Sequence, residues 1–321
     1  MTVGILLVGG RGTRLGPITS EIPKPMLPIA GKPVTEHQII AAQRAGVTTL
    51  VLATSYLSEI FTPYFGDGSK WGIDLRYAVE KEPLGTGGAI AHAATHLDQG
   101  SADEPVVIFN GDVLSGHDLA AQIAFHQKKK ADVTLHLIQV EDARAFGCVP
   151  TDGDGRVEAF LEKMENPVTN WINAGCYVFS REVINAIPKE RVVSVERETF
   201  PSLIEDKADV YGYKEAAYWL DIGTPTALFK GTRDYVAGDF ITAPTAAIDA
   251  TARITGGSSI GAGTVISAGV AIDNSIIGEN VEIGQGAQIT RSFIASGSKV
   301  EADSELFDRY ISATEDLPII F

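Results

Sequence analysis

Several positively charged side chains follow a glycine-rich stretch near the amino terminus. An apolar run, Val3–Val8, leads into Gly9-Gly10-Arg11-Gly12-Thr13-Arg14-Leu15, and Lys24 follows between two prolines. Glycines let backbone N–H groups approach a phosphate closely, and fixed cations suit a triphosphate whose pyrophosphate must leave. Neither a dinucleotide fingerprint nor a Walker loop fits, because Leu15 stands where the first needs glycine and no Gly-Lys-Ser/Thr follows. The pattern predicts a triphosphate site of another kind.

Two acidic residues stand at predicted strand ends that lie far apart in the chain. Asp112 follows the apolar run Val106–Phe109, and Asp221 lies within Trp219-Leu220-Asp221-Ile222-Gly223-Thr224. Mg²⁺ usually takes one or two carboxylates and completes its coordination with phosphate oxygens and water. We therefore expect the two carboxylates to share one Mg²⁺ in a cleft with Arg14 and Lys24. For Asp112 alone, the alternative is an Asx turn.

Three further motifs have residue types that suit a sugar phosphate or a base. Glu162 and Lys163 end the run Phe160-Leu161-Glu162-Lys163; a glutamate accepts hydrogen bonds from sugar hydroxyls, and a lysine balances a phosphate. Asn173-Ala174-Gly175 adds an amide and a glycine that permits close approach. Leu84-Gly85-Thr86-Gly87-Gly88 precedes an alanine-rich stretch and offers backbone to a base or a phosphate. The alternatives are a solvated ion pair for Glu162 and Lys163, and a helix entry turn for the glycine loop.

Alternating strand-like and helix-like segments must position these residues. Strands are predicted at 3–8, 49–53, 75–79, 106–109 and 133–140, and helices at 34–45, 58–65, 88–96, 119–129 and 225–236. Strands separated by helices indicate parallel pairing in an α/β sheet with both faces covered. Ligands of such folds bind beyond the carboxyl ends of the strands.

A repeat of aliphatic residues follows in the last quarter of the chain. Residues 248, 254, 260, 266, 272, 277, 283, 289, 294, 300 and 306 are aliphatic and lie six apart, with two steps of five. This period predicts a triangular β-helix, in which each side contributes one inward residue. We expect a catalytic domain at 1–236, a linker at 237–247, a β-helix at 248–307 and a tail at 308–321 that does not continue the repeat.

Composition excludes several classes of protein. The 321 residues suggest two domains, and the formal net charge of −15 argues against a nucleic-acid partner. Two cysteines, Cys148 and Cys176, are too few for a disulfide framework, so we expect reduced, buried thiols. No run approaches the ~20 apolar residues of a membrane span or has the form of a signal peptide, so we expect a cytoplasmic protein. The six histidines show no metal-binding spacing.

Taken in order, these motifs resemble the sugar-1-phosphate nucleotidyltransferase family. The run Gly9–Leu15 with Pro23-Lys24-Pro25-Met26-Leu27-Pro28 looks like the family signature, and the later motifs follow in family order over about 225 residues. The resemblance implies a Rossmann-like nucleotidyltransferase domain with a mostly parallel sheet, followed by a short left-handed β-helix of hexapeptide repeats. Within the family, the segments 82–88, 146–149 and 172–179 are similar to bacterial mannose-1-phosphate guanylyltransferases. This implies GTP and mannose 1-phosphate as substrates and GDP-mannose as product.

The resemblance also implies a role for each residue that matches a family motif. It assigns catalysis to Arg14, Lys24 and Asp112, and Mg²⁺ binding to Asp112 and Asp221. It assigns nucleotide binding to Gly9, Gly10, Gly12, Thr13, Arg14, Glu80, Gly85 and Thr86, and sugar-phosphate binding to Gly147, Glu162, Lys163, Asn173 and Gly175.

Other interpretations stay open at this point. Glucose 1-phosphate with dTTP, UTP or GTP is an alternative substrate pair, and a sugar-nucleotide-sensing regulatory subunit is a non-enzymatic alternative. An acyltransferase β-helix is disfavoured because such sites generally use a histidine, and none follows His136. The incomplete end of the β-helix must be capped or paired, so we expect a homo-oligomer in which the apolar residues Leu317–Phe321 serve one of these purposes.

Overall fold

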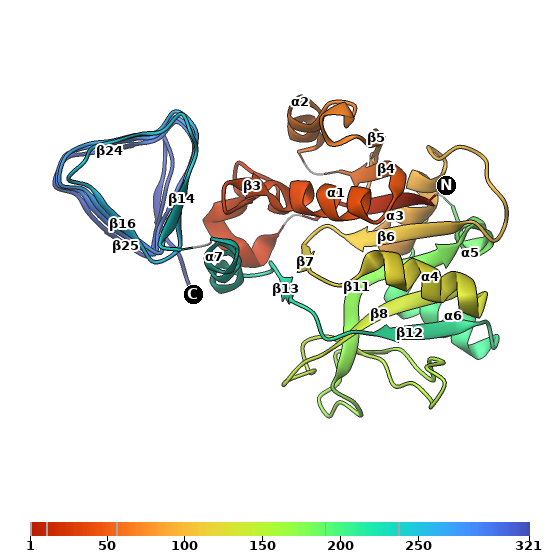
Figure 1. Ribbon diagram of the computed structural model, residues 1–321. Coiled ribbons are helices and arrows are strands. Elements are labelled where there is room, and N and C mark those ends of the chain that lie inside the picture. Colours follow the sequence, from red (N-terminus) through yellow and green to blue (C-terminus); the bar gives the residue numbers. More distant parts are fainter. Residues whose placement is uncertain (1, 11, 56, 190, 237) are drawn as a thin grey trace. The chain divides into compact units, whose positions relative to one another are not determined.

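The computed structural model describes residues 2–10, 12–55, 57–189, 191–236 and 238–321 (Figure 1). Arg11, one of the two arginines of the glycine-rich loop, lies outside this part of the chain. The chain divides into two compact units, one formed by Met1–Gly10 with Thr35–Trp219, the other by Arg11–Val34 with Leu220–Phe321. In the described part of the chain, every helix is too short or too polar to cross a lipid bilayer.

The first unit is built on a nine-stranded sheet with the order β10-β9-β11-β6-β1-β4-β5, in which β8 pairs with β11 and β12. Its strands are β1 (Thr2–Leu7), β4 (Val47–Thr54), β5 (Asp74–Val79), β6 (Pro105–Asn110), β8 (Val133–Gln139), β9 (Gly147–Cys148), β10 (Leu161–Glu162), β11 (Trp171–Ser180) and β12 (Val210–Lys214). Strands β6, β1, β4 and β5 pair in parallel, whereas β11 runs antiparallel to β6. The α/β fold with a mostly parallel sheet is confirmed.

Helices connect the strands of this sheet. They are α1 (Val34–Arg44), α2 (Phe61–Phe65), α3 (Gly85–Ala94), α4 (Leu119–Lys129), α5 (Arg181–Ala186) and α6 (Phe200–Glu205), with the short helical turns η3 (Ser58–Ile60), η4 (Ser69–Trp71) and η5 (Val195–Thr199). The bounds of helix α4 follow from its local sequence. Asp118 caps its start by accepting a hydrogen bond from the Ala121 N–H, and Lys128 and Lys129 lie in its last turn, where positive charge is favourable. Both cysteines are buried free thiols, as expected.

The second unit begins with two short helical turns, η1 (Thr13–Thr19) and η2 (Lys24–Met26), and a hairpin of β2 (Pro28–Ile29) and β3 (Lys32–Pro33). After the chain returns to this unit, α7 (Pro225–Tyr235) packs against η1 and β2. Thr224 caps this helix by accepting a hydrogen bond from the Ala227 N–H at 3.2 Å, and Pro225 occupies its first turn. The short strand β7 (Val113–Ser115) belongs to the first unit, and β13 (Trp219–Asp221) spans the point in the sequence at which the chain passes from the first unit to the second.

The repeat forms a three-sided coil of short strands, seen end-on as a triangle in Figure 1. One side stacks β14 (Phe240–Thr242), β17 (Ser258–Ile260), β20 (Ile276–Ile277), β23 (Phe293–Ile294), β26 (Arg309–Ile311) and β27 (Asp316–Pro318). The second stacks β15 (Ala247–Ile248), β18 (Val265–Ile266), β21 (Glu282–Ile283) and β24 (Lys299–Val300). The third stacks β16 (Arg253–Thr255), β19 (Ala271–Asp273), β22 (Gln288–Thr290) and β25 (Glu305–Phe307). The aliphatic residues of the repeat form one buried core, which confirms a β-helix.

The coil extends past both boundaries expected from the sequence. Strand β14 lies in the expected linker and pairs in parallel with β17. Strand β26 lies in the expected tail and pairs in parallel with β23, so that Ile311 continues the inward column of Ile294. The step from Leu306 to Ile311 is five residues, and Asp308 turns the corner in the left-handed region with φ of 56°. Only β27 departs from the repeat, because it folds back antiparallel to β26.

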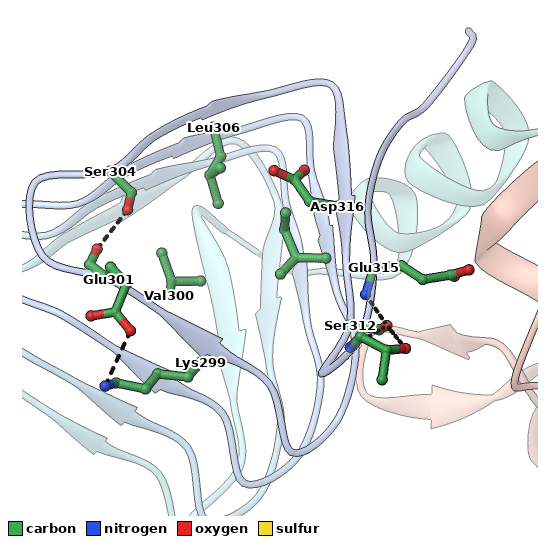
Figure 2. Close-up of a pocket in the computed structure, with 10 residues that line it drawn as sticks. Lys299, Val300, Glu301, Ser304, Leu306, Ser312, Glu315 and Asp316 are labelled. Atoms are coloured by element: carbon green, nitrogen blue, oxygen red, sulfur yellow. Dashed lines mark hydrogen bonds and ion pairs between the residues drawn. The ribbon is translucent and has the colours of Figure 1, made fainter.

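The last coil leaves an open pocket of about 330 Å³ at the carboxyl end of the β-helix (Figure 2). Val300, Leu306 and Ile311 line it with apolar surface, and Lys299, Glu301 and Glu315 are among its polar lining residues. Lys299 forms an ion pair with Glu301 at 3.2 Å, and Ser304 donates a hydrogen bond to the Glu301 carbonyl at 2.7 Å. The inner columns of the repeat therefore end at this pocket.

Candidate functional site

The carboxyl ends of two adjacent parallel strands lead into Gly9 and Gly10 and into the Asp112 loop. Gly9 and Gly10 follow β1, and Asn110 ends β6 opposite Leu7. The Gly111 N–H donates to the Leu7 carbonyl at 2.9 Å, and a Cβ at position 111 would come within 2.3 Å of that oxygen. Only glycine fits this approach, which places the half-buried Asp112 two residues beyond the end of β6.

The neighbouring strands β4 and β5 end at the same edge. Ser55 follows β4 and donates its hydroxyl to the Gly9 carbonyl at 2.9 Å, and the Glu80 N–H after β5 donates to the Thr54 carbonyl at 2.9 Å. Burial raises the pKa of Glu80, and a hydrogen bond from the Leu84 N–H opposes this effect. Glu80 is thus held beside the start of the second glycine loop.

The loop Leu84–Gly88 enters helix α3 and packs against the segment 191–196. A Cβ at Gly85, which has φ of 71°, would lie 2.6 Å from the Val193 carbonyl oxygen, and the Gly87 N–H donates to that oxygen at 2.8 Å. Thr86 donates its hydroxyl to the Glu196 carboxylate at 2.7 Å and accepts a hydrogen bond from the Val195 N–H at 2.9 Å. The glycines therefore fit a close backbone contact, and nucleotide binding by Gly85 and Thr86 stays a prediction.

Two short strands at the far edge of the sheet carry the expected sugar residues. Gly147 on β9 faces Glu162 on β10, and a Cβ at Gly147 would come within 2.9 Å of the Glu162 Oε2 atom. Lys163 follows with a left-handed φ of 50°, unusual for a lysine, and its ammonium lies 3.8 Å from the Glu162 carboxylate. The Lys163 side chain is 63% exposed, so a phosphate can reach it.

A bulge in β11 joins the sugar residues to the Asp112 loop. The pairing of β11 with β8 shifts between Asn173 and Tyr177, and Gly175, with φ of 76°, lies in this shift. A Cβ at Gly175 would lie 3.0 Å from the Asn110 amide nitrogen. Asn173 accepts a hydrogen bond from the Gly175 N–H at 3.0 Å and donates one to the buried Tyr177 hydroxyl at 2.8 Å. The bulge therefore places Asn173 and Gly175 beside the residues that lead to Asp112.

In the second unit, both expected cations lie against Asp221. The Arg14 Nη2 atom is 3.7 Å from one carboxylate oxygen of Asp221, and the Lys24 Nζ atom is 3.6 Å from the other. The Lys24 side chain is only 7% exposed, whereas that of Arg14 is 65% exposed. These residues are far apart in the sequence, and the fold brings them together as expected. The arrangement leaves Arg14 open to an anion while Lys24 is held below the surface.

Local backbone geometry explains this cluster. Gly12 has φ of 66°, and a Cβ there would come within 2.9 Å of the Lys24 Cβ atom. The Lys24 carbonyl accepts a hydrogen bond from the Leu27 N–H at 3.1 Å, which closes the turn η2; Pro23 precedes this turn and Pro25 lies within it. A Cβ at Gly223 would lie 2.5 Å from the Arg14 Nη2 atom. Glycine at position 223 therefore leaves room for the Arg14 guanidinium beside Asp221. Thr13, one of the residues expected to bind the nucleotide, is exposed on η1.

Asp112 belongs to the first compact unit and Asp221 to the second, so joint metal binding by these residues stays a prediction. Over the described ranges, no group of three or more His, Cys, Asp or Glu side chains has the arrangement of a metal site.

Sequence reasoning did not find two residues that support the site. Glu196 accepts hydrogen bonds from Thr86 and Ser194, and Tyr177 accepts one from Asn173. Burial raises the pKa of the Tyr177 hydroxyl far above its usual range, so this group stays protonated. Glu196 lies in none of the motifs, and the resemblance of the segment 172–179 assigned no role to Tyr177. Only the packing of β11 and η5 shows what the two residues contact.

Comparison with known proteins agrees with this organisation. A family model described as nucleotidyl transferase matches residues 3–238, and a second, described as the GMPPB C-terminal domain, matches residues 236–315. A mannose-1-phosphate guanylyltransferase of Mycobacterium tuberculosis is 52% identical over 245 residues, which cover 76% of this chain and 66% of that protein. A mannose-1-phosphate guanyltransferase of Yarrowia lipolytica is 33% identical over 268 residues, which cover 78% of this chain and 73% of that protein.

A solved structure is also similar to this chain. The crystal structure of HddC from Yersinia pseudotuberculosis complexed with GMP-PN matches with a TM-score of 0.62 and 27% identity, over 74% of this chain and 100% of that one. The chain covers just under two thirds of the mycobacterial relative's length.

Proposed function

The chain belongs to the nucleotidyl transferase family, and from this premise we propose that it makes GDP-mannose and pyrophosphate from GTP and mannose 1-phosphate. The observation that carries the choice of substrates is the 52% identity to a protein named mannose-1-phosphate guanylyltransferase. The expected guanylyltransferase-like segment Glu82–Gly88 agrees with this choice.

The proposed reaction is a direct displacement at phosphorus. An oxygen of the mannose phosphate forms a bond to the α-phosphorus of GTP as the bond to the departing pyrophosphate breaks. Because the attacking oxygen is already ionised, positioning and charge neutralisation supply the catalysis, and no general base is needed. Arg14 and Lys24 would neutralise the triphosphate, with Lys24 held rigidly by its burial and Arg14 able to move onto its anion.

The other candidate residues would bind the remaining parts of the two substrates. Gly9, Gly10, Gly12 and Thr13 would line the phosphates, and Glu80, Gly85 and Thr86 the base. Gly147, Glu162, Asn173 and Gly175 would hold the mannose, and Lys163 its phosphate.

Members of the family generally use a divalent metal ion, and we assign Mg²⁺ here. Asp112 and Asp221 each offer a carboxylate at the end of a strand, a donor type that a hard cation prefers. When bound, Mg²⁺ would add positive charge where the pyrophosphate leaves.

A substrate matrix tests the proposal. We would measure pyrophosphate release with GTP, ATP, UTP and dTTP against mannose 1-phosphate and glucose 1-phosphate, with and without Mg²⁺. We expect the highest kcat/KM for GTP with mannose 1-phosphate and no turnover in EDTA. Preference for dTTP or UTP with glucose 1-phosphate would overturn the substrates, and binding of GDP-mannose without turnover of any pair would indicate a sensor.

We also propose that the protein is a cytoplasmic homo-oligomer. The open pocket at the last coil and the exposed apolar residues of the last coil and the carboxyl-terminal segment, such as Phe307 at 61% and Ile320 at 84% exposure, support assembly. Light scattering at micromolar concentration is the test, and a monomer would reject the oligomer.

A further inference from the structure

One side of the β-helix buries its outward-facing residues, which a solvent-exposed coil would not do. Ser259, Ile276, Phe293 and Tyr310 stand in register along β17, β20, β23 and β26. Each is at most 2% exposed, although the inward positions of these strands are taken by the isoleucine column that includes Ile294 and Ile311. Outward residues on the other two sides are open, as Val265 at 47% and Phe307 at 61% show.

Elements of the same compact unit lie against the buried side. Helix α7 contacts β17, and the corner before β17 comes so close that a Cβ at Gly257 would lie 2.8 Å from the Arg233 Cα atom of α7. Farther along the coil, the Tyr310 hydroxyl lies 3.4 Å from the Ser20 hydroxyl. This distance is long for a hydrogen bond between hydroxyls. The packing of the buried Tyr310 ring, which is stacked on Phe293, therefore contributes more to the contact than the hydrogen bond does.

Ser20 ends the turn that carries Arg14. Its N–H and its hydroxyl both donate to the Pro17 carbonyl, at 3.1 and 2.8 Å, and Thr19 donates to the Gly12 carbonyl at 3.3 Å. The turn η1 is therefore closed on itself, with α7 packed on it and Tyr310 at its carboxyl end. Burial raises the pKa of Tyr310, which keeps its hydroxyl neutral beside Ser20.

We propose that Tyr310, in the last coil of the β-helix, is a positioning residue that holds η1 so that Arg14 stays against Asp221 and meets the triphosphate. The inference rests on the proposed function for its catalytic consequence, but the placement of η1 can be measured without it. By holding η1, the carboxyl-terminal coil would contribute to nucleotide binding in its own chain.

The test compares Tyr310→Ala and Tyr310→Leu with Phe307→Ala, an aromatic truncation in the same coil at an exposed position. We expect Tyr310→Ala to raise KM for GTP about tenfold, a part of the roughly 100-fold that a displacement of 1 Å can cost, and to change KM for mannose 1-phosphate less than about twofold. Phe307→Ala should leave both values unchanged. Tyr310→Leu keeps apolar bulk in the buried column, so it should fold even if the alanine variant does not, and should raise KM for GTP in the same direction.

Hydrogen exchange of the free protein supplies the second readout. Amides of residues 12–33 should exchange about tenfold faster in the Tyr310 variants, while the sheet of the first unit exchanges as in the wild type. Folded Tyr310 variants with wild-type exchange in 12–33 and wild-type KM for GTP would overturn the proposal. If the wild type turns over no nucleotide at all, the proposed function fails, and the exchange comparison still decides whether Tyr310 holds η1.

Discussion

The candidate residues of the two compact units are held in place by different forces. In the first unit, backbone hydrogen bonds between parallel strands set the positions of the Asp112 loop and Glu80, and Gly111 lets two strand ends approach to hydrogen-bonding distance. In the second, Arg14 and Lys24 reach Asp221 at 3.7 and 3.6 Å through side chains alone. The residues of the first unit resist displacement because the sheet would have to move with them. The cations of the second unit depend on the packing of the short turns η1 and η2 that carry them.

Because of this contrast, we expect substitutions in the first unit to affect mainly the stability of the protein and substitutions in the second to affect mainly its catalysis. Crowding the backbone of the first unit should lower the free energy of unfolding, because the displaced atoms belong to paired strands. Changing charge in the second unit should alter catalysis with little loss of stability. Four substitutions test the distinction, from the largest expected effect to the smallest.

Replacing Lys24 with alanine should have the largest effect. Loss of a fixed cation at the triphosphate should lower kcat about 100- to 1,000-fold, as loss of a single preorganised stabilising group does in other enzymes. Thermal unfolding should stay close to that of the wild type, and Lys32→Ala, at an exposed lysine of the same segment, should keep full activity. Near-normal turnover by Lys24→Ala would show that the assigned role is wrong.

Replacing Gly111 with alanine should destabilise the first unit. The new Cβ would meet the Leu7 carbonyl at 2.3 Å, so β1 and β6 must shift, at a cost of about 2 to 3 kcal/mol in the free energy of unfolding. Urea denaturation measures this cost. Gly153→Ala is the control, since its Cβ would find no atom of the described chain within 4 Å. Equal stability of the two variants would contradict the close approach.

Acid should weaken the unit that contains the histidines. All six lie within residues 35–219, and burial lowers the pKa of His136 to about 3 and that of His126 to about 4. In the unfolded chain a histidine binds its proton near pH 6.5, so stability is fully present above that pH and is lost as pH falls toward the folded values.

The wild type should lose about 2 kcal/mol of its free energy of unfolding between pH 7 and pH 5 through His136, and His136→Phe should remove this loss. Phenylalanine keeps an aromatic ring against His117, whose ring centroid lies 4.0 Å from that of His136. Urea denaturation of both proteins at the two pH values is the measurement. An unchanged pH dependence in the variant would exclude His136 as its source.

Replacing Gly223 with alanine should have the smallest effect. Its Cβ would come within 2.5 Å of the Arg14 Nη2 atom, which ends a flexible and mostly exposed side chain. Arg14 can swing aside, so stability should change by less than about 0.5 kcal/mol while KM for GTP rises about threefold. A loss of stability as large as that of Gly111→Ala would remove the contrast between the two units.

Much of this architecture could be predicted because its signals are local. The helix Leu119–Lys129 was expected with the bounds that α4 has, since a capping aspartate, an apolar stripe and terminal lysines lie within one short segment. The six-residue steps predicted the inward column of the β-helix for the same reason. The end of that column was missed, although Ile311 follows Leu306 by the same five-residue step that leads to Ile277 and Ile294. Asp308 turns this corner with a left-handed φ, as Arg291 turns the one before it.

The sequence alone therefore determined the alternation of strands and helices, the period of the coil and the residue types available for phosphate chemistry. These follow from interactions between residues a few positions apart. The motifs also led us to expect Arg14 and Lys24 near Asp221, and the tertiary structure supplied the distances. Only the tertiary structure decided that Gly175 lies against Asn110 and that Tyr310 reaches Ser20. Such pairs are separated by tens to hundreds of residues, and their contact depends on how whole elements pack, which no short stretch of sequence encodes.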